Sequence, residues 1–167
     1  MNVAPTAQWS ADEAHANFLR CCGSERWARA MVAETPYPSE ERLLDVANAA
    51  FDAMAEIDWL EAFRAHPKIG DLASMKKKFA STANWSAGEQ GAMSEAAEEL
   101  LTELAAANAE YETKNGFIFI VCATGKSPRE MLTRLRERLA HTRDEELRIA
   151  AGEQRKITHI RLEKLLP

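Results

Sequence analysis

A histidine followed directly by a proline, His66-Pro67, is the pair in this sequence best suited to proton chemistry. A neutral imidazole can give or accept a proton near pH 7. The proline ends any preceding helix and restricts the backbone of His66, so the ring can be held facing a cleft. The same position is also typical of a helix C-terminus, where histidine interacts favourably with the helix dipole. The residues alone therefore leave both a catalytic and a capping role open for His66.

Ser86, Glu89 and Arg161 are further side chains that could bind an anionic or ureide-like substrate. Ser86 and Glu89 have the spacing of a capping box, and a helix N-terminus also attracts carboxylates. Arg161 follows Ile160 at the edge of an apolar stripe, where most arginines extend their charged end into water. If it turned inward, its guanidinium would offer two parallel N–H groups to a carboxylate or a urea carbonyl. Structural and binding roles are both open for these three residues.

Several classes of function are excluded by what the sequence lacks. It contains no glycine-rich phosphate loop, no nucleophile elbow and no H-E-x-x-H or C-x-x-C motif, and its four histidines lack metal-ligand spacing. The formal net charge of −5 argues against a nucleic acid as the main partner. No apolar run approaches the roughly 20 residues needed to span a bilayer. The first residues do not resemble a secretory signal. Three cysteines, of which Cys21 and Cys22 are adjacent, do not form a disulfide framework. We expect a cytoplasmic protein.

Helix-start signals dominate the chain, and its 167 residues fit one domain spanning residues 1–167. Helices are expected to begin after Ser10, Ser24, Ser39, Ser86, Ser127 and Thr142, and at Asp58. The stops are expected near Gly23, before Pro36, at His66 and at Asn115-Gly116. Apolar stripes at helical spacing are expected at Leu43, Leu44, Ala47, Ala50, Phe51 and Met54, at Met93, Ala97, Leu100, Leu101 and Leu104, and at Leu147, Ala150, Ala151, Ile157, Ile160 and Leu165.

One segment, residues 117–122, differs from the helical pattern. Its β-branched and aromatic residues favour a strand, but no partner strand is evident elsewhere. A lone strand would leave its backbone groups unpaired. We therefore predict an all-α fold, a single-domain multi-helix bundle with one extended connector near residues 117–122. The N–H groups of this connector would be available to something other than a sheet.

Taken together, these residues resemble the 2-oxo-4-hydroxy-4-carboxy-5-ureidoimidazoline (OHCU) decarboxylases of urate breakdown, in their bacterial form. The resemblance covers roughly residues 15–166. The matching motifs are Phe18-Leu-Arg-Cys-Cys-Gly-Ser-Glu-Arg-Trp-Ala28, Asp58-Trp-Leu-Glu-Ala-Phe63, His66-Pro-Lys-Ile-Gly-Asp71, Ser86-x-x-Glu89-Gln90, Gly116-Phe-Ile-Phe-Ile-Val-Cys122 and Lys156-Ile-x-x-x-Arg161-Leu162.

The resemblance implies an all-helical homodimer that needs no cofactor. The residues themselves, as described above, predict no metal site and no binding to nucleic acid or membrane. It implies that His66 is the catalytic acid, with Glu89 beside it. It implies that the substrate contacts Pro67, Ser86, Gln90, the backbone N–H groups of residues 119–125, including Phe119 and Val121, and Arg161 at the far side. The reaction would convert the ureidoimidazoline to (S)-allantoin.

Two positions depart from the pattern of the resemblance. Many relatives carry arginine where this chain has Thr124, and another residue, often phenylalanine, where it has Asn115. A basic contact with the substrate would then be missing or supplied by Lys126. The alternative to an enzyme is a non-catalytic helical protein that binds ureides or carboxylates, or that serves as an interaction module. A large exposed apolar stripe would indicate the interaction module, and loss of His66 or Glu89 would indicate the binding protein.

Overall fold

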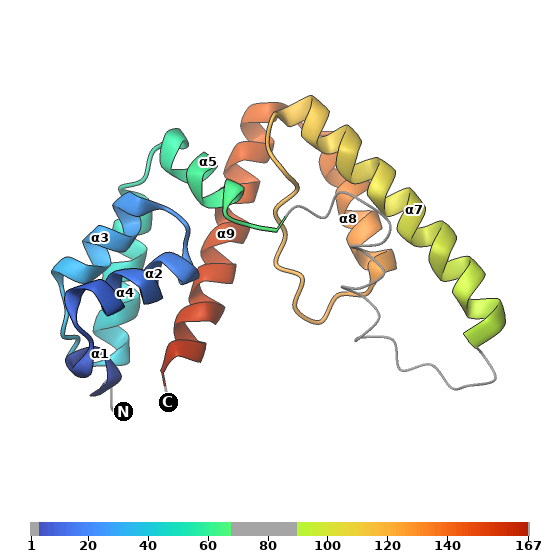
Figure 1. Ribbon diagram of the computed structural model, residues 1–167. Helices are drawn as coiled ribbons and strands as arrows, with labels where there is room; N and C mark the ends of the chain where they lie inside the picture. Colours follow the sequence, from blue (N-terminus) through green and yellow to red (C-terminus); the bar gives the residue numbers. More distant parts are fainter. Residues whose placement is uncertain (1–3, 68–89, 167) are drawn as a thin grey trace. The chain divides into compact units, whose positions relative to one another are not determined.

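The computed structural model describes residues 4–67 and 90–166, in which helices are joined by turns and loops and no strand is present (Figure 1). The all-α prediction is therefore confirmed. The helices are α1 (Ala4–Gln8), α2 (Ala11–Cys21), α3 (Glu25–Ala33), α4 (Glu40–Asp52), α5 (Glu56–Arg64), α7 (Gln90–Asn115), α8 (Pro128–Leu139) and α9 (Arg143–Leu165). None of the helices in the described ranges is long and apolar enough to cross a membrane.

Contacts divide the chain into two compact units. The first unit comprises residues 1–66, 120–122 and 147–167, and the second comprises residues 67–119 and 123–146. The first unit therefore holds α1 to α5 and most of α9, and the second holds α7, α8 and the first turn of α9. The expectation of one domain over residues 1–167 stays a prediction.

Aromatic side chains form the centre of the first unit. Phe18 of α2 packs edge-on against Trp27 of α3 and against Tyr37, with ring centroids 6.2 and 6.1 Å apart. Trp27 donates its indole N–H to the carbonyl of Ala47 on α4 at 3.1 Å, and the Tyr37 hydroxyl donates to the carbonyl of Met31 at 2.7 Å. Each ring thus buries its apolar area while its polar atom is hydrogen-bonded. This core fixes α2, α3 and α4 against one another.

The turn between α2 and α3 is held tightly against the end of α5. Ser24 caps α3 by accepting from the N–H of Trp27 at 3.3 Å, and the Glu61 carboxylate of α5 accepts from the N–H of Glu25 at 2.5 Å. A Cβ atom added to Gly23 would lie 2.3 Å from the Cβ of Ala65. The Cys-Cys-Gly-Ser motif therefore serves close packing, since only glycine allows the turn to approach the residue that precedes His66.

Replacing Gly23 with alanine is expected to destabilise the protein by about 1–3 kcal/mol, because neither the turn nor Ala65 has a flexible end that could move aside. Gly152→Ala is the matched control: a Cβ at Gly152 meets nothing within 4 Å, and the residue lies within α9. This control should raise stability by about 0.5–1 kcal/mol. Urea denaturation measures both variants. Equal stability of the two variants would contradict the packing described for Gly23.

The second unit is built on α7 and α8, which contact each other. Leu101 and Leu104 are buried, as their helical spacing predicts, whereas Ala97 and Leu100 are half-buried. The side chain of Met93 lies outside the described residues. Leu132 and Leu135 of α8 complete the apolar contact. The predicted stripe is therefore confirmed at Leu101 and Leu104 and only partly at Ala97 and Leu100.

Most predicted helix ends are confirmed. Ser10, Ser24, Ser39 and Ser127 are N-caps whose side chains accept a backbone N–H, and Thr142 caps α9 in the same way. The predicted start of α5 at Asp58 is wrong: the helix begins at Glu56. Asp58 instead occupies the third helical position, where its carboxylate accepts from the N–H of Ala55 at 2.9 Å. The predicted start after Ser86 lies outside the described residues.

The apolar stripe predicted for α9 is confirmed at its beginning and wrong at its end. Leu147, Ala150 and Ala151 are buried, but Ile157, Ile160 and Leu165 are only half-buried. The buried face continues instead through Gln154, Thr158 and Leu162, which are 0%, 2% and 0% exposed. Two polar side chains thus lie in the core of the first unit, where polar groups need hydrogen-bond partners. One of the partners is the predicted catalytic histidine.

Candidate functional site

His66 lies just past the end of α5. The helix ends at Arg64, and the N–H of His66 donates to the carbonyl of Phe63 at 3.1 Å in the last turn before Pro67. This contact involves the backbone of His66 and not its imidazole, which is half-buried. Its Nε2 lies 2.5 Å from Oε1 of Gln154 on α9. The side chain of His66 is thus held by a hydrogen bond to the buried amide, which favours a positioned ring over a solvated one.

Gln154 is itself held within α9. Its Nε2 donates to Oγ1 of Thr158 at 3.2 Å, and the Thr158 hydroxyl donates to the backbone carbonyl of Gln154 at 2.8 Å. Residues four apart on a helix are neighbours on its surface, so this local bond fixes the amide. His66, Gln154 and Thr158 form a continuous hydrogen-bonded row inside the first unit.

Arg161 lies on the same face of α9, two turns beyond Gln154. Its Nη1 donates to the carbonyls of Arg20 and Cys21 at 3.2 and 3.5 Å, and the side chain is half-buried. These carbonyls lie at the C-terminal end of α2, which a cation stabilises. A guanidinium carries five N–H donors, and both contacts use the same nitrogen. Arg161 therefore does turn inward, and its role toward a substrate stays a prediction.

The connector between α7 and α8 is extended, as predicted, and forms no strand in this described segment. It ends in a turn from Ala123 to Lys126, in which the N–H of Lys126 donates to the carbonyl of Ala123 at 3.0 Å. Gly125 has a φ of 74°, as position three of a type II turn requires. Phe119 and Val121 are half-buried, Thr124 is exposed and Lys126 is half-buried.

The ring of Phe119 is fixed within the second unit by two buried side chains. The guanidinium carbon of Arg138 lies 4.5 Å from the centre of the Phe119 ring, and the Tyr111 ring packs edge-on against it with centroids 5.3 Å apart. Cation–π and edge-to-face contacts of this kind orient a ring rather than merely cover it. Arg138 and Tyr111 thereby hold the Phe119 side chain within the second unit.

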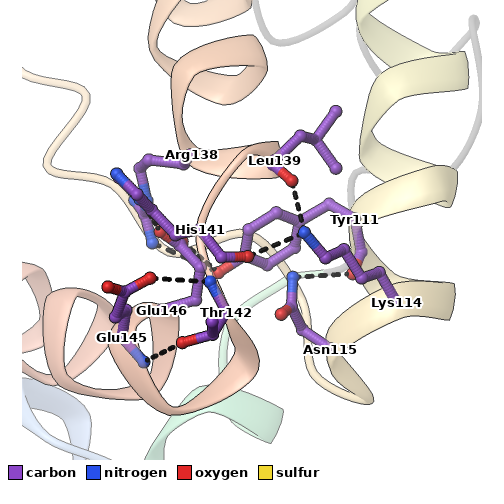
Figure 2. A network of polar contacts seen from close by, with 9 residues as sticks. All are labelled: Tyr111, Lys114, Asn115, Arg138, Leu139, His141, Thr142, Glu145 and Glu146. Atoms are coloured by element: carbon purple, nitrogen blue, oxygen red, sulfur yellow. Dashed lines mark hydrogen bonds and ion pairs between the residues drawn. The ribbon is translucent and has the colours of Figure 1, made fainter.

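Figure 2 shows the buried polar network to which Arg138 and Tyr111 belong. Glu146, fully buried in the first turn of α9, accepts from Nε of Arg138 and from the Tyr111 hydroxyl, each at 2.7 Å. Nδ1 of His141 lies 2.8 Å from its second oxygen. Lys114 donates to the carbonyls of Leu139 and His141 at the end of α8. The Glu146 charge is thus satisfied on both oxygens, as a buried carboxylate requires.

Asn115 belongs to the same region of the structure. It is 1% exposed, its amide nitrogen donates to the Tyr111 carbonyl at 3.1 Å, and its own carbonyl accepts from Nε of Arg143 at 3.1 Å. This departure from the family pattern therefore ends α7 and joins it to α9 within the second unit. Its part in substrate binding, raised by the sequence, has no support in these contacts.

The other predicted site residues are only partly described. Ser86 and Glu89 lie outside the described residues, and Gln90 is the first residue of α7 with its side chain outside them. Pro67 is exposed. Of the residues predicted from sequence, His66, Val121 and Arg161 belong to the first unit, whereas Pro67 and Phe119 belong to the second. In the described part of the chain, no group of three or more His, Cys, Asp or Glu side chains is arranged to hold a metal ion.

A hollow of about 290 Å³ in the first unit contains none of the predicted site residues. It faces the side of α9 that carries Arg148 and Arg155, away from Gln154 and Arg161. Arg155 is paired with Asp52, and its guanidinium carbon lies 4.8 Å from the centre of the Phe51 ring. The lining residues are Phe51, Asp52, Trp59, Arg148, Ala151, Gly152 and Arg155.

Cys21 and Cys22 are buried thiols that stay protonated at neutral pH. Burial raises the pKa of Cys21 to about 12 and that of Cys22 to about 11, which outweighs the opposing effect of Arg161 on both. Only the thiolate is a strong nucleophile. The adjacent cysteines therefore act as small core residues rather than as reactive groups.

At pH 8, a thiol with a pKa of 11 is ionised in about one molecule in a thousand. Iodoacetamide should therefore label Cys122, which is half-buried, at least about 100-fold faster than Cys21 or Cys22 in the folded protein. Peptide mass spectrometry of briefly treated protein measures this. Cys122→Ser should abolish the fast labelling, and urea should expose the other two thiols. Fast labelling of Cys21 in folded protein would contradict the burial described here.

Comparison with known proteins gives consistent relationships. The family model described as OHCU decarboxylase matches residues 7–163. The chain is 42% identical over 146 residues to "Uric acid degradation bifunctional protein TTL" of Arabidopsis thaliana, covering 87% of this chain and 45% of that protein. It is 33% identical over 139 residues to "Putative 2-oxo-4-hydroxy-4-carboxy-5-ureidoimidazoline decarboxylase" of Homo sapiens, covering 83% of this chain and 80% of that protein.

A third relative, "2-oxo-4-hydroxy-4-carboxy-5-ureidoimidazoline decarboxylase" of Amia calva, is 37% identical over 59 residues, which are 35% of this chain and 34% of that protein. The chain thus spans less than half the length of the Arabidopsis and Amia relatives.

Two solved structures share the fold. "Crystal structure of OHCU decarboxylase in the presence of (S)-allantoin" superposes with a TM-score of 0.71 at 35% identity, covering 94% of this chain and 98% of that one. "Crystal structure of (S)-allantoin synthase" has the same TM-score at 18% identity, covering 99% of this chain and 54% of that one. The second supports the fold alone, whereas the family match extends over nearly the whole chain. This protein belongs to the OHCU decarboxylase family.

Proposed function

We propose that this protein is a cofactor-independent carboxy-lyase that converts 2-oxo-4-hydroxy-4-carboxy-5-ureidoimidazoline to (S)-allantoin in urate breakdown. The observation that carries the proposal is the family match over residues 7–163, which extends through both units. The similarity to a decarboxylase crystallised in the presence of (S)-allantoin supports the same substrate class. The reaction and the purine-catabolic role follow from membership and are tested below.

In this proposal, the protein supplies orientation and a proton rather than an electron sink. The bond between the hydroxyl-bearing ring carbon and its carboxylate breaks, and carbon dioxide leaves. The electron pair forms a C=C bond to the neighbouring ring carbon, which bears the ureido group, and the electrons of its C=N bond take up a proton on nitrogen. The ureido-bearing carbon then receives a proton on one face, while the hydroxyl loses its proton and becomes a ring carbonyl, which makes the product a single enantiomer. Positioning and electrostatic stabilisation suffice for such a step.

His66 is proposed as the catalytic acid, because it is a titratable ring fixed by the buried amide of Gln154. Glu89 is proposed to lie beside it and to crowd the departing carboxylate. Arg161 is proposed to bind the far side of the substrate, supported by its inward orientation in the first unit. The remaining proposed contacts are Pro67, Ser86, Gln90 and the connector backbone at Phe119 and Val121.

A homodimer in the cytoplasm is the proposed working form. The dimer rests on the family resemblance, and light scattering coupled to gel filtration tests it.

Carbon dioxide release tests the reaction itself. The substrate is prepared by oxidising urate and hydrolysing the first product with upstream enzymes, and the chain is then added. We expect carbon dioxide to evolve in proportion to protein concentration, well above spontaneous decay. Saturable binding of (S)-allantoin without any acceleration of carbon dioxide release would favour the non-catalytic ureide-binding protein instead.

A further inference from the structure

The side-chain amide of Gln154 connects the imidazole of His66 to the interior of the first unit. Gln154 is 0% exposed and Thr158 is 2% exposed, so water does not compete for their hydrogen bonds. The amide contacts His66 at 2.5 Å through one atom and Thr158 at 3.2 Å through the other. A buried side chain with one donor end and one acceptor end can determine whether its neighbour donates or accepts the hydrogen bond between them.

Thr158 decides which end of the amide faces the histidine. The hydroxyl hydrogen of Thr158 is used in the 2.8 Å bond to the backbone carbonyl of Gln154. Toward the Gln154 side chain, Thr158 can therefore only accept, so the atom facing it must be the NH₂ group. The carbonyl oxygen Oε1 then faces His66 and can only accept.

Because Oε1 accepts, Nε2 of His66 must donate. We propose that Gln154 is a positioning residue that keeps a proton on Nε2 of His66 in both charge states of the ring. The proton that His66 gains and gives up is then the one on Nδ1. The expected effect of Gln154 on kcat rests on the proposed function, because it requires His66 to be the catalytic acid.

The neutral amide suits this position better than a carboxylate would. A carboxylate partner stabilises the imidazolium and holds the proton more firmly, as in the carboxylate–histidine pairs of many active sites. An amide fixes the tautomer and the ring orientation without adding a charge. The ring can therefore release its Nδ1 proton during the reaction and recover it afterwards.

The tautomer itself can be observed without activity. Long-range ¹H–¹⁵N correlation spectra of the full chain distinguish protonated from unprotonated ring nitrogens, and His66→Asn assigns the signals of His66. We expect neutral His66 to carry its proton on Nε2, and Gln154→Met to yield a mixture of the two tautomers. A wild-type ring protonated on Nδ1 would overturn the inference, even if the chain proves to be the proposed enzyme.

Kinetics separate positioning from structure. Gln154→Met, whose thioether sulfur is only a weak acceptor, should lower kcat about 10- to 100-fold and leave KM within about threefold. Gln154→Glu keeps an acceptor, so it should keep the Nε2–H tautomer and lose less rate than Gln154→Met, although its charge holds the imidazolium proton more firmly. Leu147→Val, another buried change in α9, should leave kcat and KM unaltered. An equal loss of kcat in the Met and Glu variants would overturn the positioning role.

The two proposals can fail separately. If the wild-type chain releases no carbon dioxide but shows the Nε2–H tautomer, the proposed function fails and the role of Gln154 in fixing the ring stands. If the wild-type chain is active but Gln154→Met retains full kcat, the function stands and the inference about Gln154 is overturned.

Discussion

Replacing His66 with alanine should lower kcat for OHCU decarboxylation by about two to four orders of magnitude, the range for losing a positioned proton donor. The fold should survive, because His66 lies past the end of α5 and is only half-buried. Stopped-flow absorbance measures the rate, and far-ultraviolet circular dichroism measures helicity. Glu89→Ala is also expected to lower kcat strongly, because Glu89 is proposed to lie beside the imidazole.

The control for this prediction is another histidine of the first unit. His15 of α2 forms a partly exposed pair with Glu25 at 2.8 Å, so His15→Ala should change activity by less than about twofold. If His66→Ala kept more than half of the wild-type kcat while His15→Ala behaved as expected, another group would have to supply the proton.

The largest effect on stability should come from the buried carboxylate network of the second unit. Arg138→Met removes a guanidinium whose side chain is 9% exposed and leaves Glu146, which is 0% exposed, with Tyr111 and His141. Breaking a buried pair costs about 3–5 kcal/mol, and we expect the lower end because two partners stay. The Tm should fall by roughly 6–12 °C. Scanning calorimetry measures this.

The matched control lies two residues away on the same helix. Arg136 pairs with Glu103 at 2.7 Å, but both side chains are more than half exposed, so Arg136→Met should cost under about 1 kcal/mol. Adding Glu146→Gln to Arg138→Met removes the buried carboxylate charge that has lost its guanidinium partner and should recover at least half of the lost stability. Similar losses for Arg136→Met and Arg138→Met would show that the buried network contributes little.

The helical framework could be predicted because its signals are local. Ser10, Ser127 and Thr142 each precede a helix with a glutamate three residues on, and the capping bonds form as expected. The connector at residues 117–122 was predictable from the conflict between its strand propensity and the lack of a partner. The start of α5 was predicted wrongly at Asp58, because an acidic residue is favoured both at the N-cap and in the first turn of a helix. Local sequence does not distinguish these two positions.

The polar groups in the core could not be found in the same way. Gln154 and Thr158 are polar, so the spacing of apolar residues alone predicts Ile157 and Ile160 on the buried face instead. Their position was nevertheless signalled: the helical phase of Leu147 and Ala150 continues to Gln154 and Thr158. The pairing of Arg138 with Glu146 depends on two helices meeting through a turn, which no local pattern encodes. The resemblance, rather than the physics of the residues, gave the roles of His66 and Glu89.

The most direct test of the central claim is the optical signal of the product. Allantoin formation from enzymatically generated substrate is followed by circular dichroism with wild-type protein, with His66→Ala and without protein. We expect a rapidly growing signal of the sign of (S)-allantoin with the wild-type chain, and only the slow, racemic background in the other two reactions. A wild-type signal that matches the protein-free reaction in rate and in optical activity would contradict the proposed function.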